Sequence, residues 1–505
     1  MAMIYMPLLV GLILSLVLES LTAPAVAALA QRPWRSWLAH IGILFSLYTM
    51  LLLLLQRPLF AIAGISALQL LLLLVNNAKY SSLREPFVFH DFEYFSDALR
   101  HPRLYLPFFG MVRSLLAILA ALLAIGYGLW FEVPLSVQIP LLSWLPQVLL
   151  LLLAGVVMCG LSCRFPPRVT LDPQDDLARV GFIASLWAYG CLARVPLQLN
   201  ECDSLLARPL ARSVSPNATL PQIVVVQSES FFDPRRAFPF IRGDLLKRFD
   251  LLRHQAIRSG ALDVPVWGAN TVRTESAFLT GLSDSALGVH RFNPYRQLSQ
   301  LQVPNLVRWL GRQGYRTVCI HPYPASFYLR DRVFPCLGFE QFIDIGAFDP
   351  AERCGNFIGD LALAERVEAL LEKADSRPLF LFVITMENHG PLHLERPRPE
   401  DEERYYTDGA PPHCADLTVY LRHLAHADEM LARVTAALAA GAREGVLCWY
   451  GDHVPIMPGV YAHYGEPAGE TEYLLWSSRC VAAPRVERLS VTRLAEHLLD
   501  YIAER

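Results

Sequence analysis

Five long apolar stretches fill the first third of the chain, and they restrict its fold more than any other feature. Each approaches the roughly 20 residues that a helix needs to cross a bilayer. The first is not expected to be a cleaved signal, because it lacks a basic start and further spans follow it. We therefore predict an α-helical membrane anchor of five transmembrane helices over residues 1–160. The stretches cover residues 4–22, 38–55, 59–77, 111–130 and 141–160.

Composition agrees with an anchor joined to a soluble domain. Of the 505 residues, 53% are hydrophobic and 18% charged, which is too apolar for a soluble enzyme, whereas the second half is too polar for a pure transporter. The net charge of −3 gives no electrostatic reason to expect a nucleic-acid partner. The ten cysteines include no CxxC pair, so metal–thiolate sites and dense disulfides are not expected. Spacing leaves one or two disulfides open.

An odd number of spans would place the two ends of the chain on opposite sides of the membrane. With the N-terminus in the cytoplasm, the long C-terminal part would lie outside. The positive-inside rule does not favour this orientation, because the inner loops offer little beyond Arg57. We expect it on functional grounds. Most basic residues near the spans fall on the outer side, namely Arg32, Arg35, Lys79, Arg84, Arg100 and Arg103.

Two polar segments adjoin the predicted spans. Residues 76–103 mix aromatic with basic side chains, and two interpretations are open: an interfacial segment that meets anionic lipid headgroups, or a solvated loop. Residues 161–216 contain Arg164 and Arg168 around a Phe-Pro-Pro sequence and a helical pattern near residues 182–189. We predict that this second segment is a juxtamembrane connector.

From about residue 217 onward, β-branched runs alternate with helical patterns. A repeated strand–helix order is typical of a largely parallel sheet covered by helices on both faces. Residues 217–505 are therefore predicted to form an α/β domain. The predicted strands cover 223–227, 316–320, 379–385 and 446–450, and the predicted helices cover 303–313, 358–372 and 417–440.

Reactive side chains follow several of these strands. Asp452 and His453 come after the apolar run 445–450, and Glu229 comes after a run that ends at Gln227. The carboxyl ends of parallel strands meet at one edge of a sheet, so these three side chains are expected to surround one cation. Mixed oxygen and nitrogen ligands suit manganese, magnesium or zinc. For the Asp–His pair, the alternative is an ordinary polar turn.

A loop before a predicted helix supplies a candidate nucleophile. Thr271 follows Trp267-Gly268-Ala269-Asn270 and precedes Thr274-Glu275. A threonine hydroxyl is a poor nucleophile at neutral pH unless a metal or a base removes its proton, and a nearby dication would do so. The alternative is that Thr274, or Thr271 itself, caps the helix, because threonine favours that position.

These motifs resemble the lipoteichoic acid synthase and phosphoglycerol transferase family, within the alkaline phosphatase and sulfatase superfamily. The resemblance covers most of the chain and implies a sulfatase-like catalytic domain. The family's metal-binding glutamate matches Glu229, and its late metal-binding pair matches Asp452 and His453. Its catalytic threonine matches Thr271, with Thr274-Glu275 and the Leu-Thr-Gly element at 279–281 following in register.

The resemblance also implies substrate residues. His321 and Arg330 match a histidine and an arginine nine positions apart, and His389 lies in a matching Glu-Asn-His-Gly element. His389 is expected to contact substrate and to exchange protons with hydroxyls. The alternatives are a salt bridge of Arg330 to an acid such as Asp331 and a structural hydrogen bond of His389. Other histidines are expected to be surface or core residues, namely His413, His423, His426 and His463.

Further features refine the resemblance. The loop at residues 77–92 is similar to that of the Gram-negative branch, which decorates periplasmic glucans. Residues 267–270 depart from the glycine-rich approach to the threonine that is common in the family. No Cys-x-Pro-Ser-Arg signature is present, which excludes a formylglycine nucleophile.

The implied reaction is a metal-dependent group transfer. A cation held by Glu229, Thr271, Asp452 and His453, with Mn²⁺ expected and Mg²⁺ or Zn²⁺ as alternatives, would activate Thr271. The threonine would take glycerophosphate from phosphatidylglycerol and pass it to a glycan or polyglycerolphosphate hydroxyl. The implied location is the bacterial inner membrane, with the domain on the periplasmic side. The alternatives are a phosphoethanolamine transferase acting on lipid A or a glycan, and a non-catalytic membrane-anchored protein that binds glycan or lipid.

Overall fold

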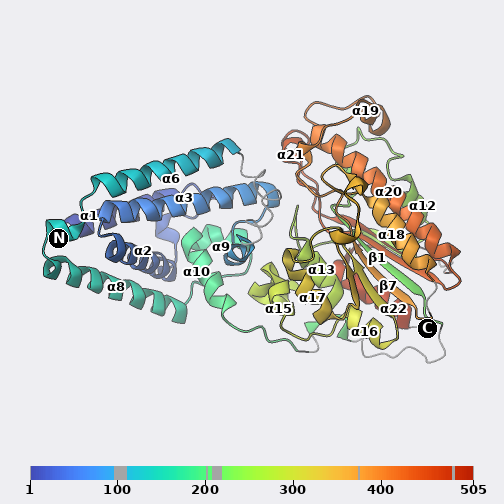
Figure 1. The fold of residues 1–505 in the computed structure, drawn as a ribbon, viewed down its shortest axis with the longest axis horizontal. Coiled ribbons are helices and arrows are strands. Elements are labelled where there is room, and N and C mark those ends of the chain that lie inside the picture. The colour runs from blue at the N-terminus through green and yellow to red at the C-terminus, as the bar shows by residue number, and fades with distance from the viewer. Residues whose placement is uncertain are drawn as a thin grey trace. The chain divides into compact units, whose positions relative to one another are not determined.

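The computed structural model describes residues 2–95, 111–200, 203–207, 219–373, 376–479 and 484–503. The chain divides into two compact units, Met1–Pro196 and Leu197–Arg505, which Figure 1 colours from blue to red along the sequence. The division falls inside the predicted connector 161–216, of which residues 201–202 and 208–216 lie outside the described part.

The first unit consists mainly of long apolar helices, which confirms the expected membrane anchor. In the described part of the chain, four helices are long and apolar enough to cross a membrane: α1 (Ala2–Glu19), α2 (Trp34–Leu55), α3 (Pro58–Leu83) and α8 (Leu141–Arg164). The predicted count of five is thereby corrected to four. The remaining stretch, 111–130, forms helix α6 (Met111–Phe131), whose side chains lie partly outside the described residues. Shorter helices are η1 (Leu29–Gln31), η2 (Phe89–Tyr94), α7 (Leu135–Gln138), α9 (Pro173–Val180) and α10 (Phe182–Ala193).

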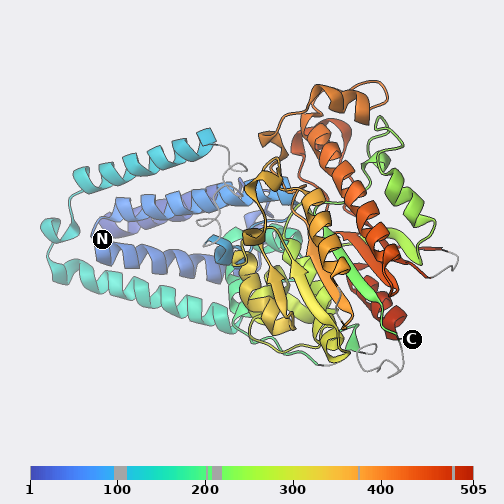
Figure 2. The same cartoon turned by 45° about the vertical axis from the view of Figure 1, so that its right-hand side comes forward.

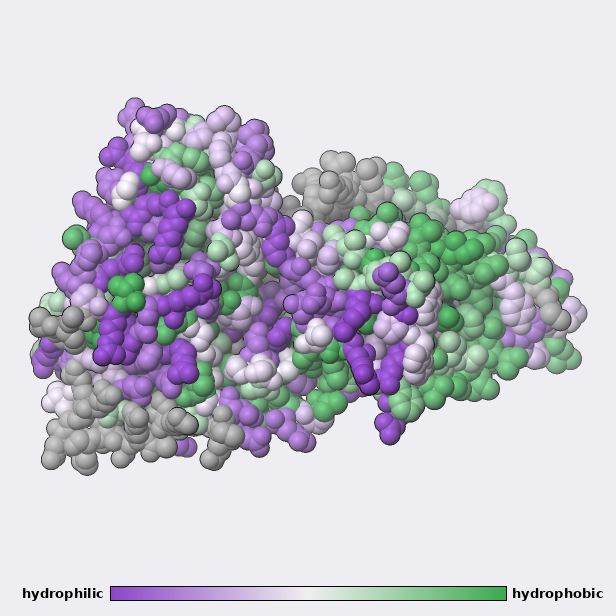
Figure 3. Space-filling model, turned by 180° about the vertical axis from the view of Figure 1, so that it is seen from behind, coloured by the Kyte–Doolittle hydropathy of each residue, from purple (hydrophilic) through white to green (hydrophobic). Residues whose placement is uncertain are grey.

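Hydrophobic side chains cover much of the outside of this unit. Figure 3 shows them as a broad green surface. Among them, Leu54, Trp130 and Leu142 are 77%, 86% and 87% exposed. Soluble proteins rarely leave contiguous apolar surface of this kind open to water. The surface is suited to contact with lipid.

Small residues let α2 and α8 approach closely. A Cβ added to Gly155 of α8 would lie 2.8 Å from the backbone nitrogen of Ser46 in α2. One added to Gly42 of α2 would lie 3.0 Å from the backbone nitrogen of Cys159. Close backbone approach through small residues is a common way for helices to pack in a membrane.

The segment after α3 is tied to the unit by ion pairs. Lys79 Nζ lies 2.9 Å from Glu85 Oε1 and 2.7 Å from Asp91 Oδ2, and Phe87 and Val88 are buried. Lys79 is therefore paired within the protein. Residues 96–103 of the predicted interfacial segment lie outside the described part, so the two interpretations of that segment stay predictions.

The second unit is built around one sheet, in the order β10-β2-β9-β8-β1-β7-β3-β4, with β11 also beside β2. Strands β8, β1, β7, β3 and β4 run parallel, whereas β9 is antiparallel to both of its neighbours. The expectation of a largely parallel sheet is confirmed. The strands are β1 (Gln222–Ser228), β2 (Arg258–Asp263), β3 (Arg316–Ile320), β4 (Gln341–Ile343), β7 (Leu379–Ile384), β8 (Gly445–Gly451), β9 (Thr471–Ser477), β10 (Arg485–Val486) and β11 (Leu489–Ser490).

Alternate residues of the central strands face two separate hydrophobic cores. Val224 and Val226 of β1 pack in one core with α12, α18 and α20, and Ile223 and Val225 pack in the other with α13, α16 and α22. Figures 1 and 2 show these helices as layers on opposite faces of the sheet. The layers consist of α12 (Lys247–Arg253), α18 (Asp360–Glu372) and α20 (Ala415–Ala440) on one face, and α13 (Thr271–Thr280), α16 (Leu306–Arg312) and α22 (Val491–Ala503) on the other.

Shorter elements connect these layers. A two-stranded hairpin, β5 (Arg353–Cys354) and β6 (Phe357–Ile358), precedes α18. The remaining α-helices among the described residues of the unit are α14 (Asp284–Leu287), α15 (Pro294–Leu298), α17 (Arg330–Leu337), α19 (Pro399–Tyr405) and α21 (Pro458–Tyr464).

Candidate metal centre and active site

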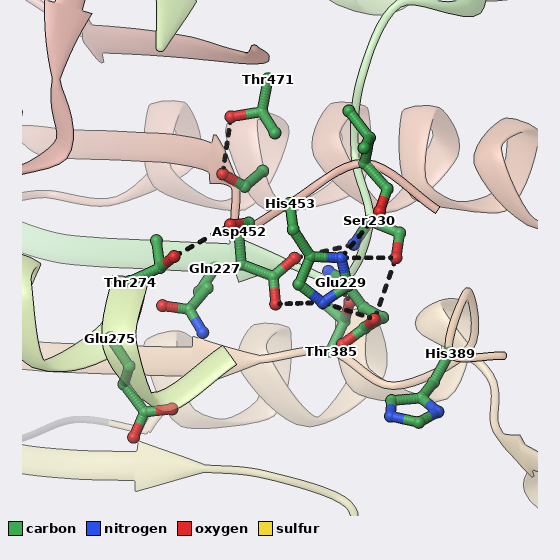
Figure 4. Close-up of polar contacts among 12 residues, drawn as sticks. Gln227, Glu229, Ser230, Thr274, Glu275, Thr385, His389, Asp452, His453 and Thr471 are labelled. Carbon is green, nitrogen blue, oxygen red and sulfur yellow. Dashed lines mark hydrogen bonds and ion pairs between the residues drawn. The ribbon is translucent and has the colours of Figure 1, made fainter. Parts of the chain in front are cut away.

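The register of the sheet brings three of the four predicted metal ligands together. Ser228 at the end of β1 pairs with Gly451 at the end of β8, so Glu229 and Asp452 leave the sheet side by side. The exposed fractions of Glu229, Asp452 and His453 are 3%, 0% and 2%. Figure 4 shows the three side chains pointing toward one another. Burying two carboxylates at such short range is unfavourable unless a positive charge accompanies them.

Distances within the group suit one cation. His453 Nε2 lies 3.5 Å from Glu229 Oε1 and 3.5 Å from Asp452 Oδ2. One ligand atom from each residue lies within 4.8 Å of the other two. Among the described residues, Asp452 Oδ2 and His453 Nε2 are buried without a hydrogen-bond partner. An unpartnered buried polar atom costs about 1–3 kcal/mol, so these donor atoms fit a bound divalent cation.

The other atoms of the ligand side chains are held in place. The Ser230 hydroxyl donates to Glu229 Oε1 at 3.0 Å, and the Ser230 backbone N–H donates to Asp452 Oδ1 at 2.8 Å. His453 Nδ1 lies 3.0 Å from the Val454 carbonyl oxygen. A carbonyl oxygen can only accept, so Nδ1 carries the proton and Nε2 keeps its lone pair for a metal.

Electrostatics within the group also favour a cation. Burial, and next the negative charge of Asp452, raise the pKa of Glu229 to about 8 in the metal-free site. A divalent cation would remove the repulsion that raises this pKa, because it favours the ionised form of each carboxylate.

A close backbone contact explains the glycine before Asp452. A Cβ added to Gly451 would lie 1.9 Å from the carbonyl oxygen of Phe231. Any larger residue would push apart the segments that follow β1 and β8, and with them Glu229 and Asp452. Gly451 is therefore part of what sets the spacing of the centre.

Thr271 is the first residue of α13, and it is 7% exposed. The helix begins after Asn270, so Thr274 lies inside its first turn and does not cap it. Instead, the Thr274 hydroxyl donates to the backbone carbonyl oxygen of Asp452 at 2.9 Å. This bond ties the start of α13 to the segment that carries Asp452. Helix N-termini favour anions, because their first N–H groups are unsatisfied and the helix dipole is positive there.

Arg330 and His321 belong to a second buried network beside the centre. Arg330 donates from Nη2 to Glu275 Oε2 at 2.7 Å and from Nε to Glu275 Oε1 at 3.2 Å. His321 Nδ1 lies 3.2 Å from the Ile384 carbonyl oxygen, and its Nε2 lies 3.2 Å from Arg330 Nη1. The Tyr295 hydroxyl also donates to Glu275. Arg330 thus has an acidic partner, and its predicted contact with substrate stays a prediction.

His389 lies close to the metal centre, and Figure 4 draws no hydrogen bond between it and Glu229, Asp452 or His453. Its Nδ1 is 2.6 Å from the Gly390 carbonyl oxygen, which leaves Nε2 available to a substrate hydroxyl. The ring packs edge-on against Phe357 of the β5–β6 hairpin, with ring centroids 5.4 Å apart. The neighbouring Glu387 accepts a 2.6 Å hydrogen bond from the Asp360 backbone N–H.

Sequence reasoning missed the residues that hold these groups. Ser230, Thr385 and Tyr295 have no motif of their own, and Glu275 was noted only as part of a family element. Thr385 accepts a hydrogen bond from the Glu229 backbone N–H at 2.9 Å, across two neighbouring strands. The one available signal was position, because Ser230 and Thr385 both lie within two residues of a strand end.

Comparison with known proteins agrees with this geometry. The sulfatase family model matches residues 221–502. The chain is 28% identical over 444 residues to the capsular polysaccharide biosynthesis protein RkpI of Rhizobium meliloti (strain 1021), covering 83% of this chain and 77% of that protein. It is 25% identical over 319 residues to a putative cyclic β-1,2-glucan modification protein of the same organism, covering 59% of this chain and 48% of that relative.

A solved structure shares the fold over nearly the whole chain. The integral membrane lipooligosaccharide phosphoethanolamine transferase A (EptA) of Neisseria meningitidis superposes with a TM-score of 0.56 at 14% identity. The match covers 97% of this chain and 95% of that one. The likeness supports a helical membrane part followed by an α/β domain.

Proposed function

The chain belongs to the sulfatase family, and from that premise we propose that it is a membrane-bound, metal-dependent phosphoglycerol transferase. It would move glycerophosphate from phosphatidylglycerol, through a covalent intermediate on Thr271, to a hydroxyl of an envelope glycan or of polyglycerolphosphate. The predicted alkaline phosphatase and sulfatase superfamily, and the expectation of an enzyme of that class, are confirmed by the family match.

One observation carries the proposal: two buried carboxylates and an imidazole face one another at the sheet edge with two unpartnered ligand atoms. Glu229, Asp452 and His453 would hold the cation, and Thr271 would complete the set. Such a cation supplies charge neutralisation and lowers the pKa of a nearby hydroxyl. Mn²⁺ is the proposed ion, with Mg²⁺ and Zn²⁺ as alternatives, because oxygen ligands with one imidazole suit all three.

In the first step, the Thr271 oxygen forms a bond to phosphorus while the bond from phosphorus to the diacylglycerol oxygen breaks. His389 Nε2 is proposed to take the proton of the Thr271 hydroxyl and pass it to the departing oxygen, because its Nδ1–H already donates to the Gly390 carbonyl oxygen and Nε2 keeps a lone pair. In the second step an acceptor hydroxyl gives its proton to His389 and takes the group from Thr271, whose oxygen regains that proton from His389. Water as the acceptor would make the reaction a hydrolysis.

Arg330 is proposed to supply a positive charge, and His321 a hydrogen bond, on the side of the metal centre where the substrate binds. Glu275 and Arg330 hold each other in a fixed geometry, and Arg330 in turn faces His321. Preorganised groups of this kind stabilise charge without rearranging during the reaction. Arg330 retains N–H groups beyond those bound by Glu275 and His321, and these would face the phosphoryl oxygens.

The membrane unit is proposed to place the domain where its lipid donor resides. Diacylglycerol released in the first step would remain in the bilayer. We infer a location in the bacterial inner membrane with residues 217–505 on the periplasmic side. A glycan acceptor is proposed because the names of the two relatives refer to a capsular polysaccharide and a cyclic glucan.

The test is to incubate full-length protein in detergent with Mn²⁺ and phosphatidylglycerol, and to look for a glycerophosphate adduct by peptide mass spectrometry. An adduct on Thr271 with release of diacylglycerol is expected. Thr271→Ala should abolish both, whereas the matched Thr271→Ser variant keeps a hydroxyl and should retain an adduct.

Other outcomes separate the alternatives. An adduct that forms only with phosphatidylethanolamine would identify a phosphoethanolamine transferase. If neither lipid gives an adduct while the protein still binds a metal and a glycan, the transferase proposal fails in favour of a binding protein.

A further inference from the structure

A second group of metal-binding side chains lies on the α20 side of the sheet edge. It consists of Cys354 in the β5–β6 hairpin, Glu387 beyond β7 and His426 in α20. One ligand atom from each lies within 4.8 Å of the other two. The group shares no residue with the centre of Glu229, Asp452 and His453.

The geometry of this group resembles a metal site with a proton in place of the metal. His426 Nδ1 lies 2.5 Å from Glu387 Oε1 and 3.7 Å from Cys354 Sγ. Tetrahedral zinc with bonds of about 2.3 Å to sulfur and 2.0–2.1 Å to nitrogen would separate those two ligand atoms by about 3.5 Å. The sulfur and nitrogen are therefore already at a suitable spacing. Ion entry would replace the proton shared by His426 and Glu387.

The ligands are also supported as metal ligands usually are. Glu387 is 1% exposed, and its Oε2 is fixed by the Asp360 backbone N–H at 2.6 Å, which leaves Oε1 directed at His426. His426 is partly exposed, so a water molecule can reach the site and serve as the fourth ligand of the metal. Carboxylates fixed by an outer hydrogen bond are typical of such sites.

We propose that Cys354, Glu387 and His426 bind a second divalent transition-metal ion, with zinc as the best match. A thiolate, an imidazole and a carboxylate form a mixed set that zinc accepts and that manganese and magnesium do not favour. The proposal does not depend on the reaction proposed above. It would revise two expectations from the sequence, because no thiolate site was predicted and His426 was expected to be a surface or core residue.

The position of the site gives the ion a structural purpose. It would join the β5–β6 hairpin and α20 to the segment that continues from Glu387 into His389. Phe357 of the same hairpin already packs against the His389 ring. The ion would therefore hold the His389 ring in place.

Cobalt substitution tests the thiolate directly. Full-length protein is stripped with a chelator and reloaded with Co²⁺, and the wild type is expected to show a near-ultraviolet thiolate-to-cobalt charge-transfer band. Cys354→Ser should lose the band and His426→Gln should weaken or lose it. Cys336→Ser is the matched control, because it removes an exposed thiol elsewhere and should leave the band unchanged.

Metal content and thiol reactivity provide independent measurements. After zinc loading, Cys354→Ser should hold one zinc ion fewer per chain than wild type, and Asp452→Asn should keep the cobalt band although it loses the other site. In wild type, zinc should slow alkylation of Cys354 by roughly tenfold or more, because a ligated thiolate is not free to react. This comparison needs no variant, so it holds even if a substitution impairs folding.

The proposal is overturned by either of two results. One is a wild-type protein without the band and without zinc protection of Cys354. The other is a band that persists in Cys354→Ser, which would assign the thiolate to a different cysteine.

Discussion

Two buried polar clusters lie within electrostatic reach of each other, and they differ in how their charges are satisfied. In the cluster of Glu229, Asp452 and His453, two carboxylates face one imidazole, and two ligand atoms have no hydrogen-bond partner among the described residues. In the cluster of Glu275, Arg330 and His321, an acid and a guanidinium form a two-bond ion pair. Both clusters are almost fully buried.

The difference indicates which cluster awaits a ligand and which supports the site. A buried ion pair that satisfies itself is costly to break but has no need of a further charge. Two adjacent buried carboxylates are unfavourable until a cation arrives. The charge of Arg330 lowers the pKa of Glu229 but does not offset burial and Asp452, which raise it. The first cluster is therefore the metal-binding centre, and the second holds Arg330 in a fixed position beside it.

The same kind of substitution, carboxylate to amide, should have opposite effects in the two clusters. Asp452→Asn is expected to abolish stoichiometric metal binding and to lower transfer at least about 10²–10³-fold, because a ligand and its charge are lost. The metal-free variant should melt at a higher temperature than metal-free wild type, since one of two repelling charges is gone. Metal titration and thermal unfolding of the full chain measure both effects. A lower melting temperature would contradict the repulsion argument.

Glu275→Gln should destabilise the protein instead. It leaves the Arg330 guanidinium buried without its anion, which costs about 3–5 kcal/mol in comparable buried pairs. Metal binding by the purified variant should persist, because none of the three ligands changes. Thermal unfolding followed by tryptophan fluorescence, together with metal content, tests this prediction. Equal stability to wild type would mean that the pair is not formed as described.

Ser230→Ala should affect the metal centre without removing a ligand. The Ser230 hydroxyl donates to Glu229 Oε1 at 3.0 Å and orients that carboxylate. Loss of a supporting group of this kind typically lowers metal affinity 10- to 100-fold. Ser285→Ala, which removes an exposed hydroxyl bonded to Ser283, serves as a control. An unchanged dissociation constant for Mn²⁺ would show that Glu229 needs no such support.

Much of the fold could be predicted because its central strands are buried on both faces. Strands β1, β3, β7 and β8 appear in the sequence as continuous apolar runs, as parallel strands usually do. Strand β9 (Thr471–Ser477) was not predicted, since it begins with the polar residues Thr471 and Glu472, both buried, and only four apolar residues follow them. Likewise, length and apolarity located the membrane helices, but gave one more span than the described residues support.

The ligands of the first centre could be predicted from the sequence, whereas the contacts of the residues around it could not. Glu229 and Asp452 directly follow parallel strands, so the topology alone brings them together. Glu275 and Arg330 meet across 55 positions, and Cys354 and His426 across 72. Such contacts depend on how helices and hairpins pack on the sheet, and no spacing in the sequence records them.

The last prediction concerns the pH dependence of metal binding, and it again separates the two clusters. The pKa of Glu229 is raised from 4.5 to about 8 in the metal-free protein, by burial first and by Asp452 next. Below that pH the carboxyl group holds a proton that a metal must displace. The apparent affinity for Mn²⁺ should therefore fall by up to about tenfold per pH unit as the pH drops from 8 toward 6, and should level off above about 8.

Measuring the same pH profile of metal affinity in Asp452→Asn and in Glu275→Gln compares the two clusters. Without the neighbouring charge of Asp452, the pKa of Glu229 should fall, so any residual metal binding should be less sensitive to pH over the same range. In Glu275→Gln the profile should keep its shape, because Asp452 still faces Glu229. Isothermal titration calorimetry in buffers of different ionisation enthalpy counts the protons released on binding. Release of no proton at pH 7 by the wild type would place the pKa of Glu229 well below 7 and remove the electrostatic argument for the centre.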